Sequence, residues 1–225
     1  MTLSVPTRIV AVLVACASLL APPLPVPRAA EGECRVIDDF SAGPIGALPS
    51  GWRVRKDSAK GVYRVTEEDG RRFLHAASRR MGIQAGKEYK WNLKEYPMLA
   101  WSWRPVEFPR GADERQSRRN DSALAVYAVF PYSPIAGKAL KYIWSEHVPP
   151  GTHLESNRGL TQVIVLRAGA AHGKQWVDER VNVLEDYRKY FGDGDAQPAG
   201  IGVLTDSDDT RSSAQGDYAN FRVCR

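Results

Sequence analysis

Short apolar or alternating runs recur along the chain, separated by Gly, Pro, Asp and Asn. Many short runs with turn residues between them predict an all-β protein, an antiparallel β-sandwich or barrel. The predicted strands are Cys34–Phe40, Trp52–Arg55, Val62–Thr66, Phe73–Ala77, Tyr89–Leu93, Met98–Arg104, Ser122–Phe130, Leu140–Trp144, Thr161–Arg167, Trp176–Val183, Gly200–Thr205 and Tyr218–Cys224.

Two of these runs indicate which side chains face the core. In Met98–Arg104, the period of two in a strand puts Leu99, Trp101 and Trp103 on one face. In Ser122–Phe130 both alternating sets are apolar, which predicts a central strand covered on both faces.

One short helix is predicted over Val183–Phe191. Asn182 and Glu185 have the outline of a capping box, and Gly192 is a natural stop. Two polar stretches with Gly and Pro are predicted to be long loops, Phe108–Asn120 and Val148–Leu160.

The N-terminal segment has the pattern of an export signal. Arg8 precedes an apolar run from Ile9 to Leu20, and four prolines follow within residues 22–27. A short apolar run behind a positive charge is typical of a signal peptide, and the prolines keep it from reaching the length of a membrane span. We therefore predict a signal peptide over residues 1–30, cleaved after Ala30, and one mature domain over 31–225, periplasmic or secreted.

A rival interpretation concerns Cys16. The stretch from Leu13 to Cys16 resembles a bacterial lipobox, which would leave Cys16 as a lipidated N-terminus. Only in that case would the sequence predict contact with a membrane.

The charge excludes one class of partner. The whole chain has a formal net charge of +5, and removing Arg8 and Arg28 with the signal lowers it. The densest basic stretch, Arg115–Arg119, lies beside Asp113 and Glu114, whereas nucleic-acid binding needs clustered, unopposed basic residues. No nucleic-acid partner is expected.

Two cysteines remain in the predicted mature chain, Cys34 and Cys224, each in a predicted strand near one end. An even count in an oxidising compartment favours a disulfide, and in many jelly rolls the first and last strands are neighbours. The alternative is two separate thiols.

An acidic segment follows the run Ile201–Leu204. Asp206, Asp208 and Thr210 alternate, and Asp217 is twelfth counting from Asp206, a spacing that suits oxygen ligands of calcium. Arg211 stands where a calcium loop needs Gly, so the simpler interpretation is a polar loop whose aspartates cap turns. A structural calcium stays open, and no other cofactor is expected.

Aromatic residues in the predicted strands are candidates for a sugar-binding face. Trp144 and Trp176 are followed by polar residues that could bind hydroxyl groups, among them Arg180, and Tyr127 lies in a central run. Core tryptophans of a sandwich have the same pattern, so both interpretations stand.

No catalytic set is recognisable. Neither a His-x-x-x-His spacing nor a Gly-x-Ser-x-Gly elbow occurs. A carboxylate pair for glycoside hydrolysis can come from separate strands, and Asp121, Asp178, Glu179 and Asp186 are possible members.

Several segments have a recognisable pattern: Val36–Ser41 with Leu48–Trp52, Tyr96–Arg104, Asp121–Phe130, Leu140–Ser145, Asn182–Tyr187 with Phe191-Gly192, and Gly200–Thr210. Together they resemble a bacterial family, domain-of-unknown-function family 3047. The resemblance spans almost the whole mature chain but implies no activity.

A looser resemblance concerns the two ends. The opening Asp38-Asp39-Phe40 and the closing Asp217–Arg222 are similar to galactose-binding-type jelly rolls and carbohydrate-binding modules. This resemblance implies paired first and last strands, often near a structural calcium.

The leading hypothesis is thus an exported, non-catalytic β-sandwich that binds a glycan or another cell-envelope component. The alternatives are an envelope polysaccharide-acting enzyme, a hydrolase or lyase, and a protein-interaction module. The predicted ligand-binding residues are Asp121, Tyr127, Trp144, Trp176, Arg180, Asp186, Asp206 and Asp208.

Overall fold

The computed structural model describes Met1 and residues 32–56, 61–133, 136–169, 175–194 and 197–225. Gly32–Arg225 form a compact unit. The predicted signal peptide and the rival lipidation of Cys16 fall outside the described residues. No helix within the described ranges is long and apolar enough to cross a membrane.

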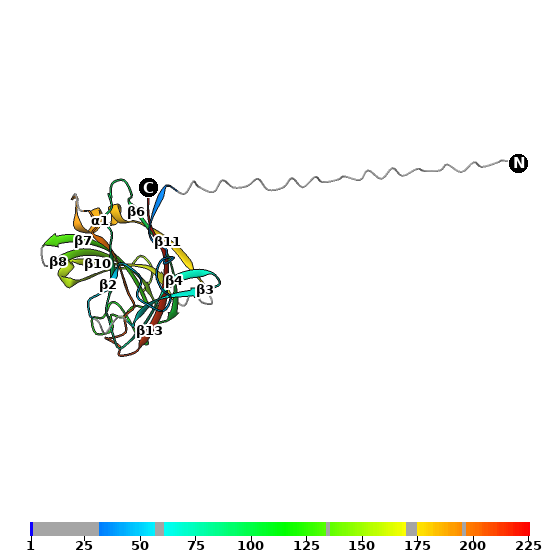
Figure 1. Ribbon diagram of the computed structural model, residues 1–225, viewed down its shortest axis with the longest axis horizontal. Helices are drawn as coiled ribbons and strands as arrows, with labels where there is room; N and C mark the ends of the chain where they lie inside the picture. The colour runs from blue at the N-terminus through cyan, green and yellow to red at the C-terminus, as the bar shows by residue number, and fades with distance from the viewer. Residues whose placement is uncertain (2–31, 57–60, 134–135, 170–174, 195–196) are drawn as a thin grey trace. The chain divides into compact units, whose positions relative to one another are not determined.

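Two sheets make up this unit (Figure 1). Sheet A has the order β11-β6-β13-β4-β3, and β1 also pairs with β13. Its strands are β1 (Cys34–Asp38), β3 (Tyr63–Glu68), β4 (Arg71–Arg79), β6 (Met98–Glu107), β11 (Val177–Asn182) and β13 (Ser213–Cys224).

Sheet B has the order β2-β5-β12-β7-β8-β10-β9. Its strands are β2 (Trp52–Val54), β5 (Ala85–Glu88), β7 (Leu124–Ser133), β8 (Ala136–Ser145), β9 (His153–Ser156), β10 (Thr161–Ala168) and β12 (Gly200–Leu204). All pairings in the two sheets are antiparallel except β8 with β10. The predicted antiparallel, jelly-roll-like β-sandwich is confirmed.

The main core lies between the two sheets, and aromatic rings span it. The Trp101 ring centroid lies 5.8 Å from that of Tyr142, and the Trp103 centroid lies 5.7 Å from that of Trp144. Leu99, Trp101 and Trp103 are almost fully buried on the core face of β6, as the period of two predicts.

Strand β7 is central and is buried on both faces, as predicted. Leu124, Val126, Ala128 and Phe130 belong to the main core, whereas Ala125 and its alternating neighbours belong to a second apolar cluster. This second cluster lies on the other face of sheet B and includes Val148, Val163 and Val165.

The predicted helix is confirmed as α1 (Val183–Phe191). The Asn182 side chain accepts a hydrogen bond from the Glu185 backbone N–H, and Gly192 ends the helix with φ 83°. That left-handed backbone conformation is one that glycine adopts without steric cost.

Two local predictions are wrong. The strand expected at Tyr89–Leu93 lies earlier, at β5, because a turn follows in which Tyr96 N–H donates to Asn92 O at 2.9 Å. The loop expected at Val148–Leu160 contains β9, which pairs with β10, and a 3-10 turn at Asn157–Gly159.

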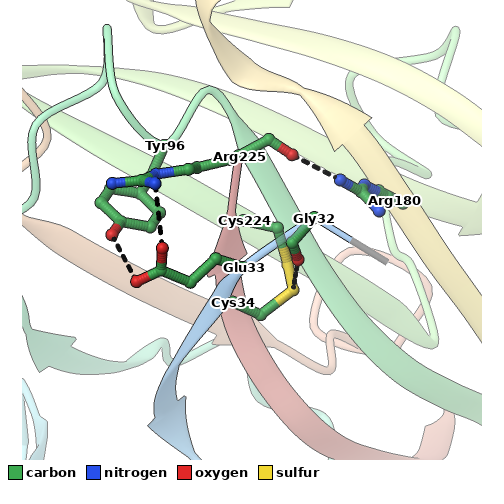
Figure 2. The surroundings of a disulfide bond; sticks show 7 residues. All are labelled: Gly32, Glu33, Cys34, Tyr96, Arg180, Cys224 and Arg225. Carbon is green, nitrogen blue, oxygen red and sulfur yellow. Dashed lines mark hydrogen bonds and ion pairs between the residues drawn. A yellow bond between two sulfur atoms is a disulfide. The ribbon is translucent and has the colours of Figure 1, made fainter. Parts of the chain in front are cut away.

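The first and last strands pair directly, and a disulfide joins them. Cys34 lies opposite Cys224 in the β1–β13 register, and their sulfurs are 2.05 Å apart (Figure 2). Glu33, which directly precedes β1, accepts a hydrogen bond from Tyr96 OH and forms an ion pair with Arg225. The predicted disulfide is therefore present.

Candidate functional site

The predicted ligand-binding residues do not gather in one place. Trp144 is 3% exposed, and its Nε1 donates to Gly169 O at 2.9 Å. The expectation that Trp144 is an exposed candidate is wrong, because it packs in the main core against Trp103.

Trp176 lies on the outer side of sheet A and is half-buried. Its ring packs edge-on against Phe73 at 5.3 Å, and the guanidinium carbons of Arg71 and Arg104 lie 4.0 and 4.8 Å from its centroid. The indole thus covers Phe73 and is covered in turn by two arginines.

Two further candidates have structural partners far from Trp176. Asp186, in the first turn of α1, accepts a hydrogen bond from Tyr142 OH at 2.9 Å, and burial raises its pKa. The Arg180 guanidinium donates to Arg225 O at 2.7 Å beside the disulfide (Figure 2).

Three predicted residues do converge: Asp121, Asp206 and Asp208 each offer a carboxylate oxygen, and these oxygens lie within 4.8 Å of one another. We call them the carboxylate triad. Asp121 precedes β7 and the other two follow β12; these strands are antiparallel neighbours, so the start of one meets the end of the other. Asp206 N–H donates to Ser122 O at 2.9 Å and fixes this contact.

Asp121 is fully buried and well supplied with donors. It accepts hydrogen bonds from Thr210 N at 2.8 Å, Thr210 Oγ1 at 2.5 Å and Asp209 N at 3.2 Å. Its role in the structure is therefore to hold the loop that follows β12, as expected for an aspartate that caps a turn.

Asp206 has an unusual environment. Burial first, and then the nearby charge of Asp208, raise the pKa of its carboxyl to about 8. Gly82 packs so closely that a Cβ there would collide with Asp206 Oδ1. The carboxyl is consequently held protonated at neutral pH in a tight space.

A buried lysine and a second buried carboxyl lie nearby. Lys141 is 5% exposed, and its positive charge lowers the pKa of both Asp206 and Glu114. Glu114 accepts hydrogen bonds from Ser145 Oγ at 2.6 Å and Ser122 Oγ at 3.2 Å, while burial raises its pKa. The positive charge of Lys141 thus offsets part of the negative charge of this acidic region.

Two residues of the spacing that suits calcium have other partners in the structure. Asp217 lies in β13, where it accepts from His75 and Arg104 at 2.7 and 2.6 Å, and Thr210 is bound to Asp121. Calcium takes six to eight oxygen ligands. The carboxylate triad is the group among the described residues that could hold a cation, with one carboxylate oxygen of each residue close to those of the other two.

Next to the triad lies a cavity of about 740 Å³, here named the loop-end pocket. It forms where three neighbouring strands of sheet A meet the loops: the end of β4, the end of β6 and the start of β13. It is lined by Arg79, Arg80, Glu107, Phe108, Arg110, Gly111, Glu146, His147, Thr210, Arg211, Ser212 and Ser213. Thr210 lines the pocket and binds Asp121, so it connects the two features.

The loop-end pocket offers hydrogen-bond donors and acceptors side by side. Arginines supply the donors, and Glu107, Glu146 and hydroxyl groups supply acceptors. Gln215 Nε2 donates to Glu107 at 2.7 Å, and Glu146 lies 3.3 Å from His147 Nε2.

Sequence reasoning missed this pocket. Its arginines come from β4 and from two separate loops, and along the chain they look like scattered surface charges. The pair Arg79-Arg80, just beyond the predicted strand Phe73–Ala77, is the one local signal that could have pointed to it.

A second, shallower cavity of about 340 Å³ lies over β5, β12 and β7. Gly86 and Gly202 form part of its floor beside Tyr127, which is 5% exposed. Tyr127 faces away from the main core, in the second apolar cluster, so this one aromatic candidate borders a cavity.

One family model matches most of the chain: "Protein of unknown function (DUF3047)" matches residues 50–222. The search of curated proteins finds no significant match.

Several solved structures are similar at low identity. A family 11 carbohydrate-binding module of a cellulosomal cellulase from Clostridium thermocellum is 10% identical, with 86% of this chain and 95% of that chain covered and a TM-score of 0.42. Endoglucanase 3 of Trichoderma harzianum, from family GH12, is 10% identical, with 88% and 99% covered and a TM-score of 0.42. The xyloglucanase domain of NopAA from Sinorhizobium fredii is 12% identical, with 82% and 90% covered and a TM-score of 0.36.

Proposed function

The chain belongs to the DUF3047 family, whose description assigns no activity. We propose that it is an exported, non-catalytic protein that binds a glycan of the cell envelope in the loop-end pocket. The observation that carries this proposal is the mixed lining of that pocket. Sugars present neighbouring hydroxyl groups that both donate and accept hydrogen bonds, and they are matched by planar side chains of both kinds.

The size and shape of the pocket support the same proposal. Small-molecule sites span about 300–1,000 Å³, and the loop-end pocket of about 740 Å³ falls inside this range. Phe108 adds an apolar surface against which the C–H face of a sugar ring can pack.

The positions of the candidate carboxylates support binding without catalysis. Asp121 holds the loop after β12, Asp186 binds Tyr142, and Asp178 accepts from Ser102 Oγ at 2.6 Å. Glu179 accepts from Arg167 Nε at 2.6 Å. These side chains already have structural partners, and none of them lines the pocket.

Export is supported by the N-terminal apolar run and by the disulfide. Disulfides persist in oxidising compartments such as the periplasm, and this one closes nearly the whole domain.

The test is affinity electrophoresis of the protein purified from the periplasm after expression of the full chain. Native gels containing neutral or acidic polysaccharides should retard it with at least one of them. The variant Glu146→Ala removes an acceptor from the pocket and should weaken retention severalfold, whereas Glu155→Ala, which removes an exposed carboxylate on β9, should leave it unchanged. Migration unaffected by every polysaccharide would contradict glycan binding.

A second candidate, an envelope polysaccharide hydrolase or lyase, is favoured by one observation. A carboxyl with a pKa of about 8, as in Asp206, stays protonated at neutral pH and can act as a general acid. Reducing-end release or absorbance of an unsaturated product from envelope polysaccharides, lost in Asp206→Asn with the fold retained, would support this candidate. Absence of turnover would eliminate it.

A further inference from the structure

Four arginines surround the loop-end pocket: Arg79, Arg80, Arg110 and Arg211. Within the described part of the chain, none of them has a carboxylate oxygen within 4.0 Å. Arg80 Nε does donate to the backbone carbonyl of Arg211 at 3.3 Å, which fixes one side chain at the rim.

Elsewhere in the described part of the domain, some arginines have an acidic partner, and others, among them Arg64 and Arg158, have none. Arg72 lies 2.9 Å from Glu67, Arg167 lies 2.6 Å from Glu179, and Arg104 pairs with Glu68 and with buried Asp217. What distinguishes the four pocket arginines is that they line one cavity together.

The acidic residues of the lining do not cancel this charge. Glu107 is engaged by Ser213 and Gln215, and Glu146 lies 3.3 Å from His147. The four arginines and two glutamates of the lining together carry a net positive charge. Like charges held in one cleft repel one another and attract an anion from solution.

We propose that the loop-end pocket selects a glycan with an anionic substituent, a carboxylate, sulfate or phosphate, over a neutral glycan of the same backbone. This inference rests on the proposed function and names the chemical class of its ligand. The guanidinium group offers a planar fork of donors that matches the oxygens of all three anions, and such charge-assisted hydrogen bonds are shorter and stronger than neutral ones.

Different side chains of the pocket bind different parts of the ligand. The arginines bind the charged substituent, while Glu107, Glu146 and the hydroxyl groups of Ser212 and Ser213 face the uncharged hydroxyls of the ring. A neutral sugar would leave the guanidinium groups without an anion, so it should bind more weakly.

The test is titration calorimetry of the periplasmically purified protein with matched oligosaccharides. The probes are tetragalacturonic acid with its fully methyl-esterified form as the neutral analogue, a sulfated and a phosphorylated oligosaccharide each with its unsubstituted parent, and inorganic sulfate and phosphate alone. We expect at least one anionic oligosaccharide to bind about tenfold or more tightly than its neutral counterpart, and its affinity to fall as salt rises. The three anionic probes identify which substituent the pocket takes.

Two double variants locate the effect. Arg79→Gln with Arg110→Gln removes two pocket charges whose side chains make no hydrogen bond in the described structure, and it should weaken binding of the anionic probe about tenfold or more. Arg64→Gln with Arg158→Gln removes two exposed charges away from the pocket and should change the affinity by less than about twofold.

The outcomes separate the two proposals. Equal affinity for acidic and methyl-esterified probes overturns the charge selectivity and leaves glycan binding standing. Equal loss in both double variants overturns the assignment to this pocket, because a basic protein then binds polyanions over its whole surface. If sulfate or phosphate binds and none of the oligosaccharides does, glycan binding itself is overturned. If the inorganic anions compete with a bound oligosaccharide, the inference is supported.

Discussion

At the scale of single residues, the environment of Asp206 makes a prediction about pH. Its carboxyl has a pKa of about 8 in the folded protein against an ordinary value of 3.8. Between these values the unfolded chain has lost the proton that the folded protein keeps. The folded state therefore binds more protons, and the free energy of unfolding falls as pH rises.

We expect the wild-type protein to lose on the order of 2–4 kcal/mol of stability between pH 5 and pH 8, and Asp206→Asn to abolish most of that loss. Urea unfolding in EDTA at several pH values measures it. Asp193→Asn, whose side chain is 94% exposed, is the control and should follow the wild type. A wild-type stability that is flat or rising over this window would contradict the prediction.

The neighbouring glycine leads to a second residue-scale prediction. A Cβ at position 82 would collide with the Asp206 carboxyl, so Gly82→Ala should destabilise the domain by about 1–3 kcal/mol. Thermal or urea unfolding measures this. Gly61→Ala, where a Cβ would have nothing within 4 Å, should stay within about 0.5 kcal/mol of the wild type.

The collision can be tested separately from the backbone. Shortening Asp206 to Ala removes the atoms that a Cβ at position 82 would meet. In the Asp206→Ala background, Gly82→Ala should therefore cost much less than it does alone. A cost that is the same in both backgrounds would mean that backbone conformation, and not this contact, requires the glycine.

At the scale of elements, the cap of α1 can be tested directly. Asn182 Oδ1 accepts from Glu185 N–H at 3.1 Å, and removing an N-cap acceptor typically costs about 1 kcal/mol. Asn182→Ala should lower the free energy of unfolding by about that amount, while Asn182→Ser, which retains an acceptor, should restore most of it. Chemical unfolding monitored by circular dichroism distinguishes the two, and equal losses would exclude capping as the cause.

The elements show where local sequence is informative. The helix was predictable from Asn182 and Gly192 because caps and stops are set by adjacent residues. The strand β5 was missed because Ala85–Glu88 contains Gly and two charged residues, whereas the more strand-like Tyr89–Leu93 leads into a turn made by Asn92. Pairing with β12 and β2 selects the earlier segment, and that pairing is not visible locally.

The same reasoning explains the partial success at the candidate sites. The aspartates of the carboxylate triad were each singled out, but only the β7–β12 pairing brings Asp121 to Asp206. Trp144 and Trp176 have the same sequence pattern but different environments. Trp144 packs against Trp103 in the main core, whereas Trp176 packs against Phe73 on the outer side of sheet A. The loop-end pocket forms where the ends of β4 and β6 lie beside the start of β13, and no local sequence pattern encodes this arrangement.

At the scale of the whole molecule, β13 connects the features that matter. In sheet A it lies between β6 and β4 (Figure 1), and it also pairs with β1. Its first residue lines the loop-end pocket, while its last, Cys224, is bonded to Cys34. The binding pocket and the closure of the chain therefore lie at opposite ends of one strand.

This arrangement gives the final prediction. The disulfide joins residues 190 apart in sequence, so in the chain-entropy model its removal costs about 5 kcal/mol. The double variant Cys34→Ser/Cys224→Ser should unfold at markedly lower temperature and urea concentration, and the reduced wild type should match it. Because the pocket lies at the other end of β13, ligand affinity under conditions where both proteins are folded should be retained. Wild-type stability in the double variant would show that the β1–β13 pairing, with its hydrogen bonds and the Glu33–Arg225 ion pair, closes the chain without the bond.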